Sequence, residues 1–162
     1  MILRDLVADD WPAVHAILRS VAEQGETYDW PADISEPQLR AMWVENPGWR
    51  TVVATTDDGA VLGVADFGPN RIGRGAHVAN ASFVVAPGAG GQGVGRALGE
   101  HVVRAARADG FAALQFNAVV ETNTAAVALW TSLGFAIIGT VPEAFEHPRH
   151  GRVGLHVMHR PL

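Results

Sequence analysis

The residues best suited to chemistry lie in a glycine-rich segment in the middle of the chain. After an apolar run that ends at Pro87, five of the next eight residues are glycine, at 88, 90, 91, 93 and 95. Glycine adopts positive φ freely and lets the backbone approach a ligand closely. If a helix begins at Val94, the loop amides point at an anion above its first turn, where the helix dipole also favours negative charge. The segment therefore predicts a site for a phosphate-bearing ligand.

Three kinds of phosphate-binding loop compete for this segment. A nucleoside-triphosphate loop places a lysine after its second glycine, but Val94 follows Gly93 and the chain contains no lysine. A dinucleotide loop needs a third glycine where Arg96 stands, and it belongs near the start of a βαβ unit. A loop that binds the pyrophosphate of coenzyme A remains. A glycine-rich surface turn without a ligand is the alternative.

A second motif favours coenzyme A. Residues 123–135 follow the pattern Asn-x-x-Ala-x-x-Leu-aromatic-x-x-x-Gly-Phe. Together with the upstream loop, this pattern resembles the GNAT (GCN5-related N-acetyltransferase) superfamily. The superfamily loop, [RQ]-x-x-G-x-[GA], falls on residues 90–95, with Gly90 in place of the arginine or glutamine. The resemblance extends over the whole chain, because the flanking elements come in the superfamily's order.

The resemblance implies where acetyl-CoA binds. In this superfamily, the strand before the loop and the strand before the second motif are parallel neighbours that splay apart, and the pantetheine arm enters the gap. It implies main-chain contacts to pantetheine from Phe83, Val84 and Val85, with one N–H polarising the thioester carbonyl. The pyrophosphate contacts implied are from Gly90, Gly91, Gln92, Gly93, Val94, Gly95 and Arg96, with side-chain contributions from Gln92 or Arg96. No metal is implied.

The sequence departs from the superfamily at Trp130, where many members carry a tyrosine that protonates the departing thiolate. An indole N–H is not acidic near neutral pH, so we expect Trp130 to face the core, at helical spacing from Ala126. Asn123 begins the same helix, where an amide N–H and the helix dipole favour a thiolate. The resemblance places Asn123 at the cofactor sulfur, a role that is compatible with capping the helix.

Two other asparagines interrupt apolar strands. Asn80 and Asn117 would lie on the two splayed strands, either at the substrate or as an amide pair that joins the strands. With Asn123 and the segment that ends in Tyr28, they resemble a subgroup typified by the fungal proline-analogue N-acetyltransferases, which acetylate azetidine-2-carboxylate. This resemblance implies catalytic roles for Asn80, Asn117 and Asn123, and substrate contacts from Tyr28, Asn80 and Asn117.

Neither a general base nor a metal site is evident. The acidic residues expected near the cleft are more typical of solvated loops; they are Glu26, Asp29 and Glu121. The histidines on or near strands that reach the cleft have no recognisable partner; they are His77, His147 and His156. His147-x-x-His150 is the nearest approach to metal-ligand spacing, but it has no third ligand in register.

Composition excludes several classes of protein. With 162 residues, 48% of them hydrophobic and 18% charged, the chain fits one globular domain over residues 1–162. A net charge of −5 argues against nucleic acid. The absence of cysteine excludes disulfides and a cysteine nucleophile. No apolar stretch suits a membrane span and no signal-peptide layout is present, so we expect a cytoplasmic protein.

Periodicity and turn residues predict an α/β (α+β) fold of the GNAT type, a mixed, mostly antiparallel sheet flanked by helices in the order βααβββαβαββ. The helices are expected from Asp9 or Asp10 to about 24, from Ser35 to 44 or 45, at 94–109 and at 123–133. The strands are expected at 2–7, 49–55, 60–67, 77–86, 113–119, about 135–141 and 152–159. We expect Arg152–His159 as an edge strand suited to a homodimer.

The function that follows is acetyl-CoA-dependent N-acetyltransfer by direct attack of a small amine or amino-acid-like acceptor, including a cyclic imino acid. The alternatives are acetylation of a protein N-terminus, a polyamine or an antibiotic, and a non-catalytic sensor that binds acyl-CoA.

Overall fold

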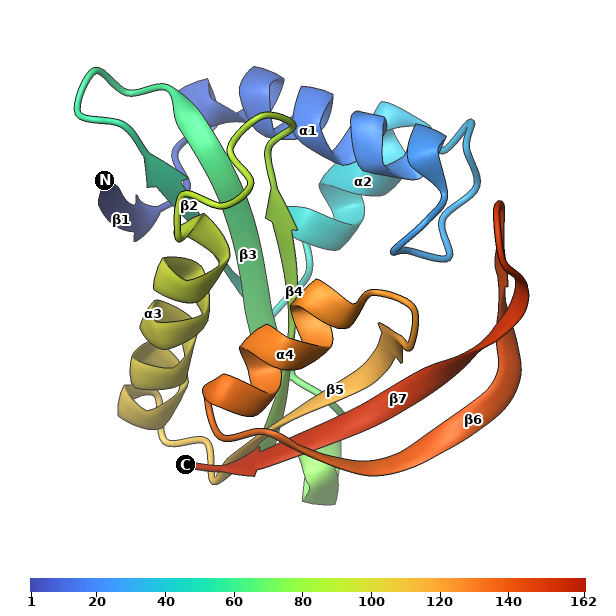
Figure 1. Ribbon diagram of the computed structural model, residues 1–162. Helices are drawn as coiled ribbons and strands as arrows, with labels where there is room; N and C mark the ends of the chain where they lie inside the picture. Colours follow the sequence, from blue (N-terminus) through green and yellow to red (C-terminus); the bar gives the residue numbers. More distant parts are fainter.

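Seven strands form one sheet, and only β4 and β5 run parallel to each other (Figure 1). The computed structural model describes all 162 residues. The sheet order is β1-β2-β3-β4-β5-β7-β6. The strands are β1 (Ile2–Asp5), β2 (Arg50–Thr55), β3 (Val61–Pro69), β4 (Val78–Val85), β5 (Ala113–Val120), β6 (Ala136–His147) and β7 (Gly151–Pro161). The helices are α1 (Trp11–Gln24), α2 (Glu36–Trp43), α3 (Val94–Ala108) and α4 (Thr124–Ser132).

The order βααβββαβαββ and the mixed, mostly antiparallel sheet are confirmed. The two C-terminal strands are longer than predicted because they pair with each other along most of their length. One prediction is wrong: Arg152–His159 is no edge strand, since β7 lies between β5 and β6. The edges are β1 and β6. None of the helices is long and apolar enough to cross a membrane.

The sheet is covered on both faces. Along β2, Val52 and Ala54 belong to a core cluster shared with α3, whereas Val53 belongs to a cluster shared with α1 and α2. This alternation follows from the two-residue period of a strand. Figure 1 shows α3 and α4 on one face of the sheet and α1 and α2 on the other. A strand covered on both faces reads as a continuous apolar run, as β2 and β3 do.

α1 begins where the sequence predicts, but Asp10 does not cap the helix as expected. Asp10 precedes the helix but makes no side-chain capping bond to it. Its carboxylate instead accepts two hydrogen bonds from Arg4 of β1, at 2.6 and 2.8 Å, and one from the Val7 N–H at 2.9 Å. These bonds to Arg4 hold the pKa of Asp10 below its usual value. Asp10 therefore fastens α1 to the edge of the sheet.

The parallel strands β4 and β5 diverge soon after they begin. Their only paired positions are Val78 with Ala113 and Ala79 with Leu114. On its other side, β5 pairs with β7, and the register shifts between Phe116 and Val119. The expected splayed pair is thus confirmed, and the facing edges of β4 and β5 beyond these positions have no strand partner.

The β6–β7 hairpin bends toward the connection between α1 and α2. Its register shifts between Val141 and Phe145, and within this shift Glu143 adopts a positive φ of 52°. Figure 1 shows the far end of the hairpin rising past the end of β5 toward that connection. Arg149 at the tip forms an ion pair with Glu26, at 2.9 Å. The hairpin tip and the α1–α2 connection are therefore joined.

Gly63 on β3 lets α3 pack closely on the sheet. A Cβ at this position would lie 2.9 Å from the Val84 carbonyl oxygen and 2.9 Å from Cγ1 of Val94, the first residue of α3. A backbone oxygen in a paired strand cannot withdraw easily. The absence of a side chain at Gly63 thus sets the position of α3 and of the loop before it.

We expect Gly63→Ala to lower the free energy of unfolding by about 1–3 kcal/mol, because the added methyl overpacks this contact. Gly139→Ala is the matched control, since a Cβ at Gly139 meets no atom within 4 Å and its φ is ordinary. That variant should change stability by less than about 0.5 kcal/mol. Urea unfolding of the three proteins measures the difference, and equal stabilities would contradict the packing argument.

Candidate functional site

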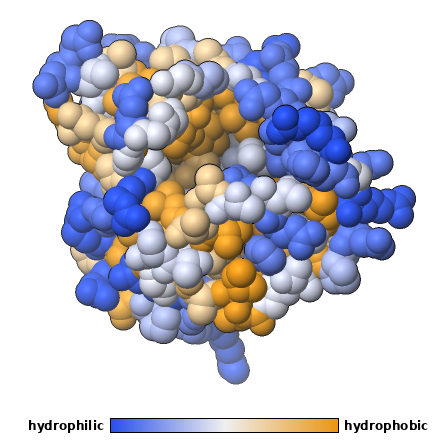
Figure 2. All heavy atoms as spheres, viewed as in Figure 1, coloured by the Kyte–Doolittle hydropathy of each residue, from blue (hydrophilic) through white to orange (hydrophobic).

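The main pocket of the molecule lies where β4 and β5 diverge. It has a volume of about 930 Å³ and is lined by residues of β3, β4, β5, α4, the glycine loop and the α1–α2 connection. Most of its lining residues are hydrophobic. Figure 2 shows this face of the molecule hollowed, with apolar side chains in the hollow and hydrophilic ones around it. Predicted cofactor residues and predicted substrate residues both line this pocket.

The glycine loop presents a row of free backbone donors to this pocket. The N–H groups of residues 90–96 have no hydrogen-bond partner within the chain. Gly91 and Gly93 adopt positive φ values of 76° and 80°, which turn the backbone into the start of α3. The side chains predicted to assist are engaged elsewhere: Gln92 donates to the Gly88 carbonyl at 3.1 Å, and Arg96 donates to Ser132 at 2.7 Å. The main chain alone can therefore receive an anion.

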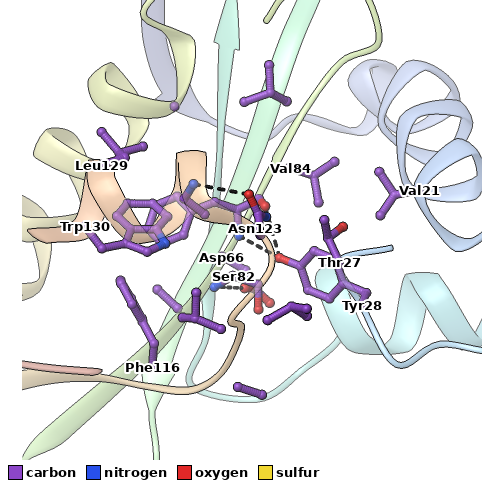
Figure 3. Close-up of a pocket in the computed structure, with 18 of the residues that line it drawn as sticks. Val21, Thr27, Tyr28, Asp66, Ser82, Val84, Phe116, Asn123, Leu129 and Trp130 are labelled. Carbon is purple, nitrogen blue, oxygen red and sulfur yellow. Dashed lines mark hydrogen bonds between the residues drawn. The ribbon is translucent and has the colours of Figure 1, made fainter. Parts of the chain in front are cut away.

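The backbone of Phe83 faces the gap between β4 and β5, and a side chain occupies it. The backbone groups of Val78 and Ala86 make hydrogen bonds toward β3. Because backbone groups alternate in direction along a strand, those of the odd-numbered residue Phe83 point the other way, toward the gap. The Tyr28 hydroxyl accepts a hydrogen bond from the Phe83 N–H at 2.9 Å and donates one to the Phe83 carbonyl at 3.0 Å. Burial raises the pKa of Tyr28 above its usual value, so the hydroxyl stays protonated. Figure 3 shows Tyr28 reaching this point from the α1–α2 side.

Trp130 lies in the core, as its helical spacing predicted. Its side chain is 7% exposed, and its ring lies 4.6 Å from that of Phe83 and 4.9 Å from that of Phe116. Phe135 extends the cluster by stacking on Phe116. These rings fill the α4 side of the gap and hold β4, β5 and α4 at fixed separations.

Asn123 caps α4 and also lines the main pocket. Its Oδ1 accepts the N–H of Ala126 at 3.2 Å. The first two N–H groups of the helix, those of Thr124 and Ala125, have no partner within the chain. Its amide NH2 makes no hydrogen bond within the chain, so donors and a positive helix end lie together here. Figure 3 shows Asn123 and Tyr28 among the residues that line the pocket.

Asn80 and Asn117 both line the pocket but do not pair with each other. Asn117 pairs with Asn70, donating to its Oδ1 at 2.7 Å and accepting from its Nδ2 at 3.3 Å, and it also accepts from Gln115 at 2.9 Å. Asn80 makes no side-chain hydrogen bond. Asn117 therefore links β5 to the segment after β3, while the Asn80 amide is free to meet a ligand.

Asp66 was not predicted from the sequence. It lies on β3 opposite Ser82 and lines the pocket, and its side chain is only 5% exposed. Its Oδ1 accepts the Ser82 N–H at 3.0 Å. Burial raises its pKa to about 7, which suits a group that exchanges a proton near neutral pH. The available signal was a carboxylate within the apolar run 61–67, where burial of a charge needs a reason.

The acidic residues and histidines that the sequence placed near the cleft have different surroundings in the structure. Glu26 pairs with Arg149, Glu121 accepts the Gly154 N–H, and Asp29 lines the main pocket. None of the three histidines considered lines the main pocket, and His147 lines a second, smaller one. The structure contains no group of three or more histidine, aspartate or glutamate side chains that could hold a metal ion.

Comparisons with known proteins agree with this geometry. A family model described as "Acetyltransferase (GNAT) family" matches residues 5–135. A GCN5-related N-acetyltransferase from Kribbella flavida is 56% identical, with a TM-score of 0.96 over 99% of this chain and 97% of that one. A phosphinothricin acetyltransferase from Sinorhizobium meliloti, solved in complex with AcCoA, is 28% identical, with a TM-score of 0.87 over 99% of this chain and 88% of that one.

A curated relative gives a partial match. N-acetyltransferase aca1 of Schizosaccharomyces pombe is 34% identical over 85 residues, which are 52% of this chain and 41% of that protein. The chain thus spans about two fifths of that relative's length. The family model, by contrast, covers most of the chain, from β1 through α4. With the fold and the glycine loop already described, this match shows that the protein belongs to the acetyltransferase (GNAT) family.

Proposed function

We propose that this protein transfers the acetyl group of acetyl-CoA to the nitrogen of a small amine or amino-acid-like acceptor. The observation that carries the proposal is the row of unpartnered N–H groups at residues 90–96, at the mouth of a gap between two diverging strands. That combination suits a diphosphate joined to an extended, hydrogen-bonding arm. The relative from Sinorhizobium meliloti, whose structure contains AcCoA, supports the same assignment.

The residues of the gap suit the thiol-bearing arm of coenzyme A. Phe83, Val84 and Val85 line it, and the Phe83 backbone offers a donor and an acceptor on the open edge of β4. We propose that these groups pair with the pantetheine arm and that the Phe83 N–H polarises the thioester carbonyl. The free side-chain NH2 of Asn123, at the positive end of the α4 dipole, would then stabilise the departing thiolate in place of the absent tyrosine.

The acceptor half of the pocket has a base and amides on one face of the sheet. Val84 belongs to the core cluster of α1 and α2, so the alternate residues Ser82 and Asn80 face the same side. Asp66, which binds the Ser82 N–H, lies with them. We propose that Asn80 and Asn117 contact the acceptor, alongside Tyr28, and that Asp66 takes its proton directly or through a water molecule.

The chemical step balances without a further reagent. Acetyl-CoA supplies an activated acetyl group when bound. As the acceptor nitrogen bonds to the acetyl carbon, the carbon–sulfur bond breaks and its electron pair leaves on sulfur. The proton that the nitrogen loses goes to Asp66, and the thiolate is stabilised at Asn123 until solvent protonates it. The chain has no cysteine to carry the acetyl group, which agrees with direct attack.

Coenzyme A binding and acetyl transfer can be measured separately. We expect calorimetry to detect coenzyme A binding, and we expect an amine panel to release thiol from acetyl-CoA together with an acetylated product seen by mass spectrometry. The panel should include a cyclic imino acid, a polyamine, an aminoglycoside and an N-terminal peptide. Binding without thiol release from any amine would favour an acyl-CoA sensor, and absence of binding would overturn the proposal.

The Tyr28 hydroxyl and the thioester carbonyl would compete for the Phe83 N–H. In Tyr28→Phe, the Phe83 backbone loses its partner, so the free protein should lose about 1–3 kcal/mol of stability. Acetyl-CoA no longer has to displace the hydroxyl, so its Kd should fall severalfold. Coenzyme A without the acetyl group is the matched control and should bind with a smaller change. A Kd for acetyl-CoA that rises instead would show that the hydroxyl contacts the cosubstrate.

The raised pKa of Asp66 predicts how both kcat/KM and the stability of the fold depend on pH. If its carboxylate is the base, kcat/KM of the wild type should rise with pH through about 7, and Asp66→Asn should lower kcat by about 10²-fold or more. Stability should move the opposite way. The folded pKa is raised above the unfolded value, so the folded protein holds a proton that the unfolded chain has released between about pH 4 and 7.

The stability contributed by protonated Asp66 is therefore present below about pH 4 and is lost as the pH rises through 7, by up to about 4 kcal/mol. Asp66→Asn should flatten this part of the pH dependence in urea unfolding at pH 5 and pH 8. A variant with an unchanged pH–rate profile and full activity would exclude Asp66 as the base.

A further inference from the structure

We propose that the second, smaller pocket binds a carboxylate carried by the acceptor amine. This inference rests on the proposed function and names its substrate class. We call it the polar pocket, and its volume is about 240 Å³. Three segments line it: the α1–α2 connection at Glu26 and Thr27, the start of α4 with the residues just before it, and the tip of the β6–β7 hairpin. Only one of its nine lining residues is hydrophobic.

The polar pocket adjoins the main pocket. Thr27, Asn123 and Ala125 line both. Asn123 is the residue that we place beside the cofactor sulfur, so a molecule whose nitrogen meets the acetyl carbon there can extend a short arm into the polar pocket.

The polar pocket is rich in hydrogen-bond donors that lack partners. The N–H groups of Thr124 and Ala125 are free, and they stand at the positive end of the α4 dipole. The Thr122 hydroxyl is buried and has no hydrogen-bond partner. The two N–H groups belong to the first turn of α4, and Thr122 lies in the connection before it. No solvent reaches the Thr122 oxygen, so it is not one of the donors that a ligand in the pocket can contact.

His147 adds an independent donor from the hairpin. Its side chain is only 5% exposed, and its Nδ1 accepts the backbone N–H of Arg149 at 3.1 Å. The neutral ring therefore carries its proton on Nε2. That nitrogen makes no hydrogen bond within the chain, and His147 lines the polar pocket. The N–H of a buried, fixed histidine is a well-placed donor for an oxyanion.

The charges favour a carboxylate in the polar pocket rather than in the main one. The only acidic residue of the polar pocket, Glu26, is paired with Arg149 at 2.9 Å, and His150 is close to His147, with ring centroids 4.6 Å apart. The acceptor side of the main pocket instead carries Asp66, which would repel a second carboxylate. An acceptor with one amine and one carboxylate therefore has a single favourable orientation, amine toward Asp66 and carboxylate toward His147.

The test compares matched acceptors in wild type and variants. Each pair is an amino acid and the amine that it becomes on decarboxylation, such as leucine and isopentylamine, and the measured quantity is the ratio of their kcat/KM values in thiol release. We expect the wild type to favour the amino acid. His147→Asn keeps an acceptor for the Arg149 N–H but removes the Nε2 donor, and it should lower the ratio by about tenfold or more.

The controls separate the possible failures. His77→Asn makes the same replacement outside both pockets and should leave the ratio unchanged, and Kd for coenzyme A should be unchanged in every variant that is folded. A ratio that His147→Asn does not lower overturns the carboxylate site while leaving acetyl transfer intact. If every amine fails to release thiol although coenzyme A binds, the proposed function is overturned, and this inference with it.

Discussion

The divergence of β4 and β5 is the constraint on which the rest of the site depends. Two parallel strands that stayed paired would satisfy each other's N–H and C=O groups and leave no room between them. Here pairing ends after two positions, so the edge of β4 is open at Phe83. Buried backbone groups must find a partner, and in the ligand-free protein the Tyr28 hydroxyl provides one for both groups of Phe83. The gap is therefore a polar site set in apolar surroundings.

Several features hold the gap open. The register shift in β5 turns that strand away while it stays paired with β7. The rings of Phe83, Phe116 and Trp130 pack against one another on the α4 side, so the strands cannot close without losing these contacts. Trp130 thus has a packing role at the position where many members of the superfamily carry a tyrosine. Rigid packing around a site of free donors keeps those donors oriented before a ligand arrives, which is the condition for effective electrostatic stabilisation.

Local patterns were enough to predict most of the fold. Period-two and helical spacing, glycines after helices and the loop at 88–95 define the elements, and the order of elements defines the sheet. The interior place of β7 could not be predicted, because it depends on β6 folding back outside it. Asp66 and the Asn70–Asn117 pair were missed for a related reason. Their significance arises from partners on other strands, namely Ser82 for Asp66 and a residue 47 positions away for Asn117.

The two sides of the gap differ in their polar groups: one has free N–H donors and the other has a carboxylate. Free N–H groups and helix starts gather where anionic or thiolate groups would lie, at residues 90–96 and at the start of α4. The carboxylate that can take a proton, Asp66, lies on the face of the sheet covered by α1 and α2. In the proposed reaction, a nucleophile that must lose a proton and a leaving group that gains negative charge would thus meet opposite surroundings. Because β4 contributes to both sides, shifting its register by one residue would exchange the faces of Asn80 and Phe83 and remove the acceptor half together with the cofactor half.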